Sequence, residues 1–176
     1  MAEVTAELMH EHELIIQYID LCENYLTPQA NNKFMDKAIA FIDFIQNFSD
    51  KFHHAKEENI LFKYLNSKET NMHCNPVPQM LFEHDEGRGY VKAMITAHTN
   101  KDTQTLTENA SAYCRLLREH IYKEDNILYP MAEDALSDAM KNIINNEYAA
   151  VAKDCNTQAV WAKYQELYTE LKNYLG

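Results

Sequence analysis

FHHAKEENILF, residues 52–62, places two histidines and two glutamates within six positions and then continues into apolar residues. A second stretch, EHIYKEDNILY at residues 119–129, repeats the plan and ends in the same Asn-Ile-Leu-aromatic pattern. Superposing the two stretches aligns two pairs of residues: His53 with His120, and Glu57 with Glu124. Residues four positions apart lie on the same face of an α-helix. The chain therefore contains the pattern His-x-x-x-Glu twice, and each copy, called a half-site here, places its two side chains on one helix face.

The composition favours an all-α fold. The chain has 176 residues, which suits one domain with a core of its own. Hydrophobic residues make up 46% and charged residues 24%, which are ordinary values for a globular protein. Only three glycines and four prolines are present, which is few for an architecture that depends on many turns.

Apolar residues recur at helical spacing in six segments, which we expect to be helices: 3–26, 33–66, 78–99, 103–129, 133–153 and 157–174. Pro78 suits the first turn of the third helix, and Pro130 is expected to end the fourth. Asp102 or Thr103 is a suitable N-cap for that fourth helix. His73 falls in the long loop before the third helix and is expected to be exposed.

The first four segments are long and are joined by mostly short loops. This predicts an antiparallel up-down-up-down four-helix bundle with additional C-terminal helices. In this interpretation residues 1–150 form the bundle domain. Residues 151–176 form a C-terminal helical extension that packs on the same domain or makes an oligomer contact.

The charge and the cysteines narrow the possible partners. The formal net charge of −11 would repel nucleic acid and anionic membranes, and no Lys/Arg cluster offsets it. The cysteines form no Cys-x-x-Cys pair and lie far apart, as unpaired thiols in a reducing cytosol would: Cys22, Cys74, Cys114 and Cys155. The sequence shows no secretory signal and no run of eighteen apolar residues, so we expect a cytoplasmic protein.

A second internal repeat supplies two further histidines. LMHEHELIIQYI at residues 8–19 and MLFEHDEGRGYV at residues 80–91 share a Glu-His pair, and superposing these pairs aligns His12 with His84. Together with the two half-sites, this gives four imidazoles and two carboxylates, a set that suits two iron or manganese ions, with zinc possible. The predicted ligands are His12, His53, Glu57, His84, His120 and Glu124. Six side chains leave coordination positions for a small ligand.

Some neighbouring residues compete for these roles. His54 with Glu58 forms a second pair one position round the helix, and His10 competes with His12. Tyr122 and Tyr129 lie near the ligands of the fourth helix and are candidates to hydrogen-bond a bound ligand.

These segments resemble, in the same order, the ligand segments of the hemerythrin family, also described as hemerythrin-like or HHE cation-binding domains. The matching stretches are EH at 11–12, HHAKEENILF at 53–62, EHDEGR at 83–88 and HIYKEDNILYP at 120–130. The resemblance covers about residues 1–150. It implies a four-helix bundle around a non-haem di-iron centre, held by the six residues predicted above. It also implies dioxygen, peroxide or nitric oxide as the small ligand.

The chain departs from the oxygen-carrying members at two positions. Those members resemble one another in having a second histidine one turn after the third-helix histidine, where this chain has Arg88. That residue is either a surface residue or lies above the open coordination position. They also often use an aspartate at the position of Asp125, which therefore competes with Glu124.

The four-histidine, two-glutamate count is closer to members that resemble iron-centre repair proteins. Those proteins carry an additional N-terminal cysteine module, which is not found here. We expect a di-iron protein that binds oxygen or a related ligand, for binding, storage or sensing. The alternative is a di-iron redox enzyme or iron-handling protein acting in oxidative or nitrosative stress. A third hypothesis is a centre that is mainly structural.

Overall fold

The structure is a computed structural model that describes residues 3–70, 72 and 74–176, so His73 lies outside the described residues. The α-helices are α1 (Ala6–Tyr25), α2 (Asn31–Phe44), α3 (Phe62–Leu65), α4 (Val77–Thr99), α5 (Thr103–Lys123), α6 (Tyr129–Ala135), α7 (Asp138–Asp154) and α8 (Thr157–Leu175). Three π-helical segments continue the longer helices: η1 (Ile45–His54), η2 (Glu57–Leu61) and η3 (Glu124–Leu128). The described residues contain no strand, which confirms the all-α prediction.

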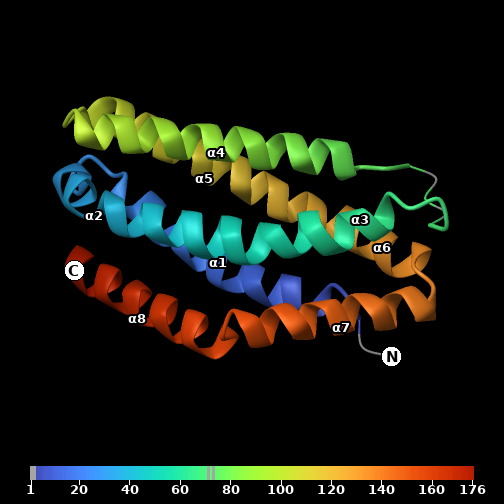
Figure 1. Cartoon of the computed structure of the whole chain (residues 1–176). Helices are drawn as coiled ribbons and strands as arrows, with labels where there is room; N and C mark the ends of the chain where they lie inside the picture. The colour runs from blue at the N-terminus through green and yellow to red at the C-terminus, as the bar shows by residue number, and fades with distance from the viewer. Residues whose placement is uncertain (1–2, 71, 73) are drawn as a thin grey trace.

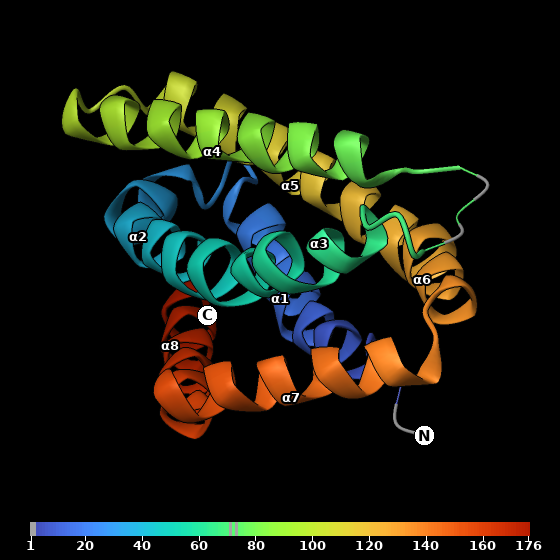
Figure 2. The same ribbon diagram turned by 45° about the vertical axis from the view of Figure 1, so that its right-hand side comes forward.

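Four long rods form the bundle. α1, the rod from α2 to α3, α4, and the rod from α5 to α6 lie side by side, and α4 packs along α5 (Figure 1). α7 packs against η2, and α8 packs against α1 and α2. The two helices meet at an angle, as the turned view shows (Figure 2). The up-down-up-down order of the four rods stays a prediction.

Two apolar clusters fill the interior. The larger one contains Tyr18, Phe48 and Leu106, and the smaller one contains Leu8, Leu61 and Tyr129. Along each of the four rods, the buried histidines and charged residues fall where the segments that supply the two clusters meet. The bundle therefore encloses a polar layer with apolar packing on both sides.

The C-terminal helix α8 is tied to the larger cluster. Tyr164 and Leu171 are buried in it. Their backbone carbonyls accept hydrogen bonds from the hydroxyls of Tyr18 and Tyr25, each at 2.6 Å. These contacts agree with an extension packed on the bundle, and the division into residues 1–150 and 151–176 stays a prediction.

The end of the fourth predicted helix was placed wrongly. The helix does not stop at Pro130 but continues to Ala135. Pro130 occupies the first turn of α6, directly after η3. A proline is tolerated there because the hydrogen-bond pattern changes where the π-helical segment ends. At the other end of this rod, Asp102 is the N-cap, and its Oδ1 accepts a hydrogen bond from the backbone N–H of Thr105 at 3.0 Å.

Two smaller findings concern the chain as a whole. All four cysteines are unpaired. Among the described residues, no helix has the length and apolar character needed to span a membrane. The cellular location stays a prediction.

Candidate metal centre

The structure brings the six predicted ligands together in the polar layer. Their donor atoms, with one from His54, form two groups, and within each group these atoms lie within 4.8 Å of one another. The first group is His12, His53, Glu57 and Glu124, and the second is His54, Glu57, His84 and His120. Because Glu57 belongs to both groups, the arrangement suits two adjacent cations that share one carboxylate. The assignment of each residue as a ligand stays a prediction.

The π-helical segments coincide with the ligand positions. η1 ends at His54, η2 begins at Glu57, and η3 begins at Glu124. A π-helix closes i→i+5 hydrogen bonds and has a wider turn than an α-helix, so consecutive side chains are separated by a smaller angle about the axis. This explains why the neighbours His53 and His54 are both buried.

The four predicted histidines form two pairs that face each other. Nε2 of His12 lies 2.9 Å from Nε2 of His53, and Nε2 of His84 lies 3.0 Å from Nε2 of His120. In each ring, Nδ1 contacts an outer carboxylate at 2.7–2.9 Å: His12 with Asp125, His53 with Glu11, His84 with Glu58, and His120 with Glu83. An Nδ1–H that donates to a carboxylate leaves the Nε2 lone pair available to a metal ion.

Lysines brace two of these outer carboxylates. Lys56 donates to Glu11 and also to Glu7, the latter at 2.8 Å, and Lys123 donates to Glu83. The Lys56 side chain is only 2% exposed, whereas that of Lys123 is 32% exposed. The outer layer is therefore dry around Lys56 and partly wet around Lys123.

This outer layer was not predicted from the sequence, although the internal repeats contained the signal. The superpositions that align the predicted ligands also align three outer pairs: Glu11 with Glu83, Lys56 with Lys123, and Glu58 with Asp125. Glu58 and Asp125 were considered only as alternative ligands. They lie outside both donor groups and contact the Nδ1 atoms of His84 and His12. Each half of the repeat thus orients a histidine of the other half.

Three carboxylate oxygens that face the site lack hydrogen bonds among the described residues, and a bound cation would compensate their charge. Glu57 Oε2 and both carboxylate oxygens of Glu124 are buried and have no hydrogen-bond partner within the described part of the chain. Two such carboxylates, beside imidazole nitrogens that point at each other, are costly in a dry interior unless a cation or a proton lies between them. This nitrogen and oxygen donor set fits iron, manganese or zinc.

In the metal-free protein, protons compensate part of this charge. Burial opposes a charged His12, but the neighbouring carboxylates outweigh it and raise the pKa of His12 to about 9. The same balance, with Glu124 as the main partner, raises the pKa of His120 to about 10. Burial, reinforced by the charge on His12, lowers the pKa of His53. The pair of His12 and His53 therefore holds one extra proton at neutral pH.

We expect the affinity for a divalent metal ion to rise with pH between about 7 and 9, because the metal must displace protons from His12 and His120. Each displaced proton changes the apparent affinity about tenfold per pH unit while the pH is below the pKa of its group. Competition titrations with a chromophoric chelator, corrected for protonation of the chelator, measure this slope. An affinity that stays constant over the range would contradict the protonated histidine pairs.

Two neighbours of the predicted ligands face solvent. His10 is exposed, pairs with Glu13 at 3.1 Å and stacks on Trp161, and it belongs to neither donor group. Tyr122 is 65% exposed, so the expectation that it lies near a bound ligand receives no support.

Tyr129 contacts a predicted ligand directly. Its hydroxyl donates to Glu57 Oε1 at 2.6 Å, and both side chains are buried. We expect Tyr129→Phe to lower the free energy of unfolding of the metal-free protein by about 1–2 kcal/mol, because Glu57 loses a buried hydrogen bond. Urea unfolding measures the change. Tyr122→Phe, an exposed control, should stay within about 0.5 kcal/mol of the parent protein, and equal losses for both variants would contradict the prediction.

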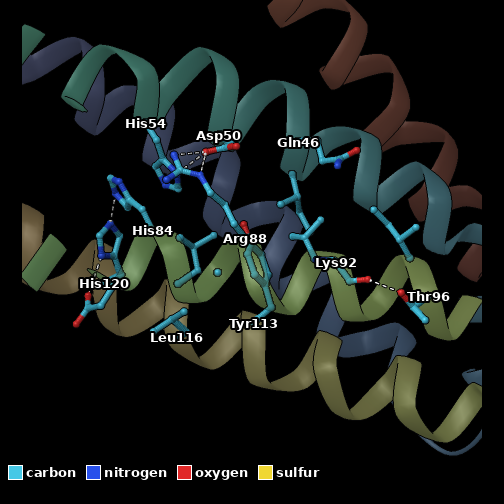
Figure 3. A pocket seen from close by; sticks show the side chains of 16 residues that line it. Gln46, Asp50, His54, His84, Arg88, Lys92, Thr96, Tyr113, Leu116 and His120 are labelled. Atoms are coloured by element: carbon cyan, nitrogen blue, oxygen red, sulfur yellow. Dashed lines mark hydrogen bonds and ion pairs between the residues drawn. The ribbon is translucent and has the colours of Figure 1, made fainter. Parts of the chain in front are cut away.

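A cavity of about 270 Å³ opens beside the second donor group (Figure 3). His54, His84 and His120 line one end, and the remaining wall is mostly apolar, including Ile45, Val91, Ile95, Leu116 and Leu117. The cavity lining includes neither His12 nor His53. A small molecule in this cavity would therefore meet the His84 and His120 side of the centre.

Arg88 lies at the wall of the cavity. Its guanidinium is partly exposed and donates to Asp50 and Glu58 at 2.7 Å and to Asp85 at 2.9 Å. Glu58 is the outer carboxylate of His84. Arg88 is thus a cavity residue that also holds the outer layer of the centre in place.

The family model of the hemerythrin HHE cation-binding domain matches residues 3–132. No curated protein and no solved structure matches the chain. The matched region contains all six predicted ligands and ends before α7.

Proposed function

We propose that this chain, which belongs to the hemerythrin HHE cation-binding domain family, holds two iron ions and binds dioxygen or a related small ligand at them. The observation that carries the proposal is the pair of donor groups that share Glu57, with three buried carboxylate oxygens left without hydrogen bonds. A bridging carboxylate and an imidazole-rich donor set are suited to two adjacent iron ions.

The residues of the chain orient the predicted ligands and bury them. Each predicted histidine is fixed by a carboxylate at Nδ1, so its Nε2 is aimed before an ion binds. The aliphatic part of the cavity wall gives the accessible side of the centre a mainly apolar surface. When bound, a pair of ferrous ions supplies two electrons to dioxygen. Binding, storage or sensing of oxygen follows if this transfer is reversible.

The size of the cavity supports a second candidate. A volume of about 270 Å³ is many times the roughly 10–15 Å³ that one buried water molecule needs. The cavity therefore has room for a reactant larger than a diatomic molecule. This favours, as the alternative, a di-iron redox enzyme or an iron-handling protein in oxidative or nitrosative stress.

The test is metal analysis of the purified protein, followed by optical spectra as the reduced protein meets air. About two irons per chain, with a charge-transfer band that appears in air and disappears on deoxygenation, are the results expected for reversible binding. Two irons that oxidise at once to a stable diferric spectrum would favour the redox alternative. Manganese or zinc in place of iron after anaerobic preparation would overturn both.

A further inference from the structure

On one side of the centre, equivalent positions of the internal repeat hold residues of different character. In the superpositions that align the predicted ligands, three polar residues coincide with apolar ones: His54 with Ile121, Asp50 with Leu117, and Arg88 with Ile16. The three polar residues lie together, as Figure 3 shows, and Arg88 donates to Asp50 from both Nε and Nη2. The repeat thus carries an additional polar cluster beside the cavity.

His54 lies at the second donor group. One of its ring nitrogens falls in the donor group of Glu57, His84 and His120. Its ring is buried and stacks on that of His84, with the ring centroids 3.8 Å apart and an angle of 12° between the planes. An imidazole lone pair lies in the plane of its ring, so one of the two rings must turn out of this stack before both nitrogens can meet at one ion.

The ring of His54 also has an outer carboxylate. Its Nδ1 lies 3.6 Å from Asp50 Oδ1, which repeats at a longer distance the contact that the other four histidines make. At this length the contact is no hydrogen bond, and Nδ1 has no other partner within the described residues. A buried imidazole nitrogen without a hydrogen bond is costly. If the side chain served packing alone, an apolar residue would suffice, as Ile121 does at the equivalent position of the repeat. Neither packing nor hydrogen bonding within the described residues therefore explains a histidine at position 54.

We propose that His54 is a fifth histidine ligand, binding the ion that Glu57, His84 and His120 hold, with Asp50 and Arg88 as its positioning residues. The inference rests on the proposed two-ion centre and goes beyond it. The two ions then differ: one has two imidazoles, and the other, beside the cavity, has three. η1 thus supplies a fifth histidine. In the oxygen-carrying family members, the corresponding histidine stands at the position that Arg88 occupies in α4 of this chain.

The test uses cobalt(II), a paramagnetic probe that does not depend on iron or oxygen chemistry. A ring N–H of each ligating histidine gives a strongly shifted, exchangeable proton resonance in the cobalt-loaded protein. We expect five such resonances in the parent protein, four in His54→Ile, and five in His10→Ala, the exposed control. Competition with a chelator should show that His54→Ile binds one of the two cobalt ions at least tenfold more weakly.

A second variant distinguishes loss of a ligand from a folding defect. His54→Ala should show the same loss, and added imidazole should restore the affinity of the weakened ion through the cavity. Four resonances in both the parent protein and His54→Ile, or unchanged affinity for both ions, would overturn the inference.

The outcomes also separate this inference from the proposed function. Two irons in the parent protein with no fifth resonance would overturn the role of His54 alone. Five resonances in a protein that is isolated without iron would support His54 and overturn the iron assignment. A parent protein that takes up fewer than two cobalt ions would overturn both.

Discussion

Glu57→Ala is expected to abolish metal binding, reducing the content from about two ions per chain to nearly none. Glu57 is the only residue that belongs to both donor groups among the described residues. Removing it therefore takes a ligand from each ion and leaves Glu124 as the single carboxylate of the two donor groups. Elemental analysis after metal loading and desalting measures the loss.

The metal-free variant is expected to melt within a few degrees of the metal-free parent protein. Burial and the nearby Glu124 raise the pKa of Glu57, so its ionised form is unfavourable and its removal relieves that cost. The gain offsets the hydrogen-bond acceptor that Tyr129 loses. The exposed Glu119→Ala should retain both ions and serves as the control. A Glu57→Ala protein that is unfolded without metal would favour the hypothesis of a mainly structural centre. A variant that keeps both ions would contradict the shared carboxylate.

Lys56→Ala is expected to lower the free energy of unfolding of the metal-free protein by about 3 kcal/mol, a typical cost of removing one partner of a buried ion pair. Lys56 and Glu11 are both buried, and Lys56 also lies 4.3 Å from the ring centroid of Phe52. Burial already raises the pKa of Glu11 to about 7, and loss of the cation would leave this carboxylate uncompensated. For a chain of this size the melting temperature should fall by roughly 6–12 °C.

The internal repeat provides a matched comparison. Lys123 occupies the position equivalent to Lys56 but is 32% exposed, so water can replace it and Lys123→Ala should cost less than half as much. Lys51→Ala, at an exposed site on the same rod as Lys56, should stay within about 0.5 kcal/mol. Equal losses for the two equivalent lysines would show that burial of the Lys56 pair is not the cause.

The long helices and the six residues that meet in the centre could be predicted from the order of the residues. The His-x-x-x-Glu pairs could be predicted because residues four positions apart share a helix face, and the repeat selected the same positions in both halves. The outer carboxylates could have been predicted as well, since Glu11 and Glu83 occupy equivalent positions of the repeat. The apolar periodicity likewise gave the approximate bounds of the long helices.

Which further groups face the site depends on the local helix geometry and on how the helices pack. α-Helical spacing offers His53 and His54 as alternatives, yet the π-helical turn buries both. The continuation of the helix past Pro130 depends on the same kind of local widening at η3. The contacts of His12 with Asp125 and of His84 with Glu58 join helices that are distant in sequence. Such pairings arise from how the helices pack, because periodicity within one helix carries no information on the residue that a neighbouring helix places opposite it.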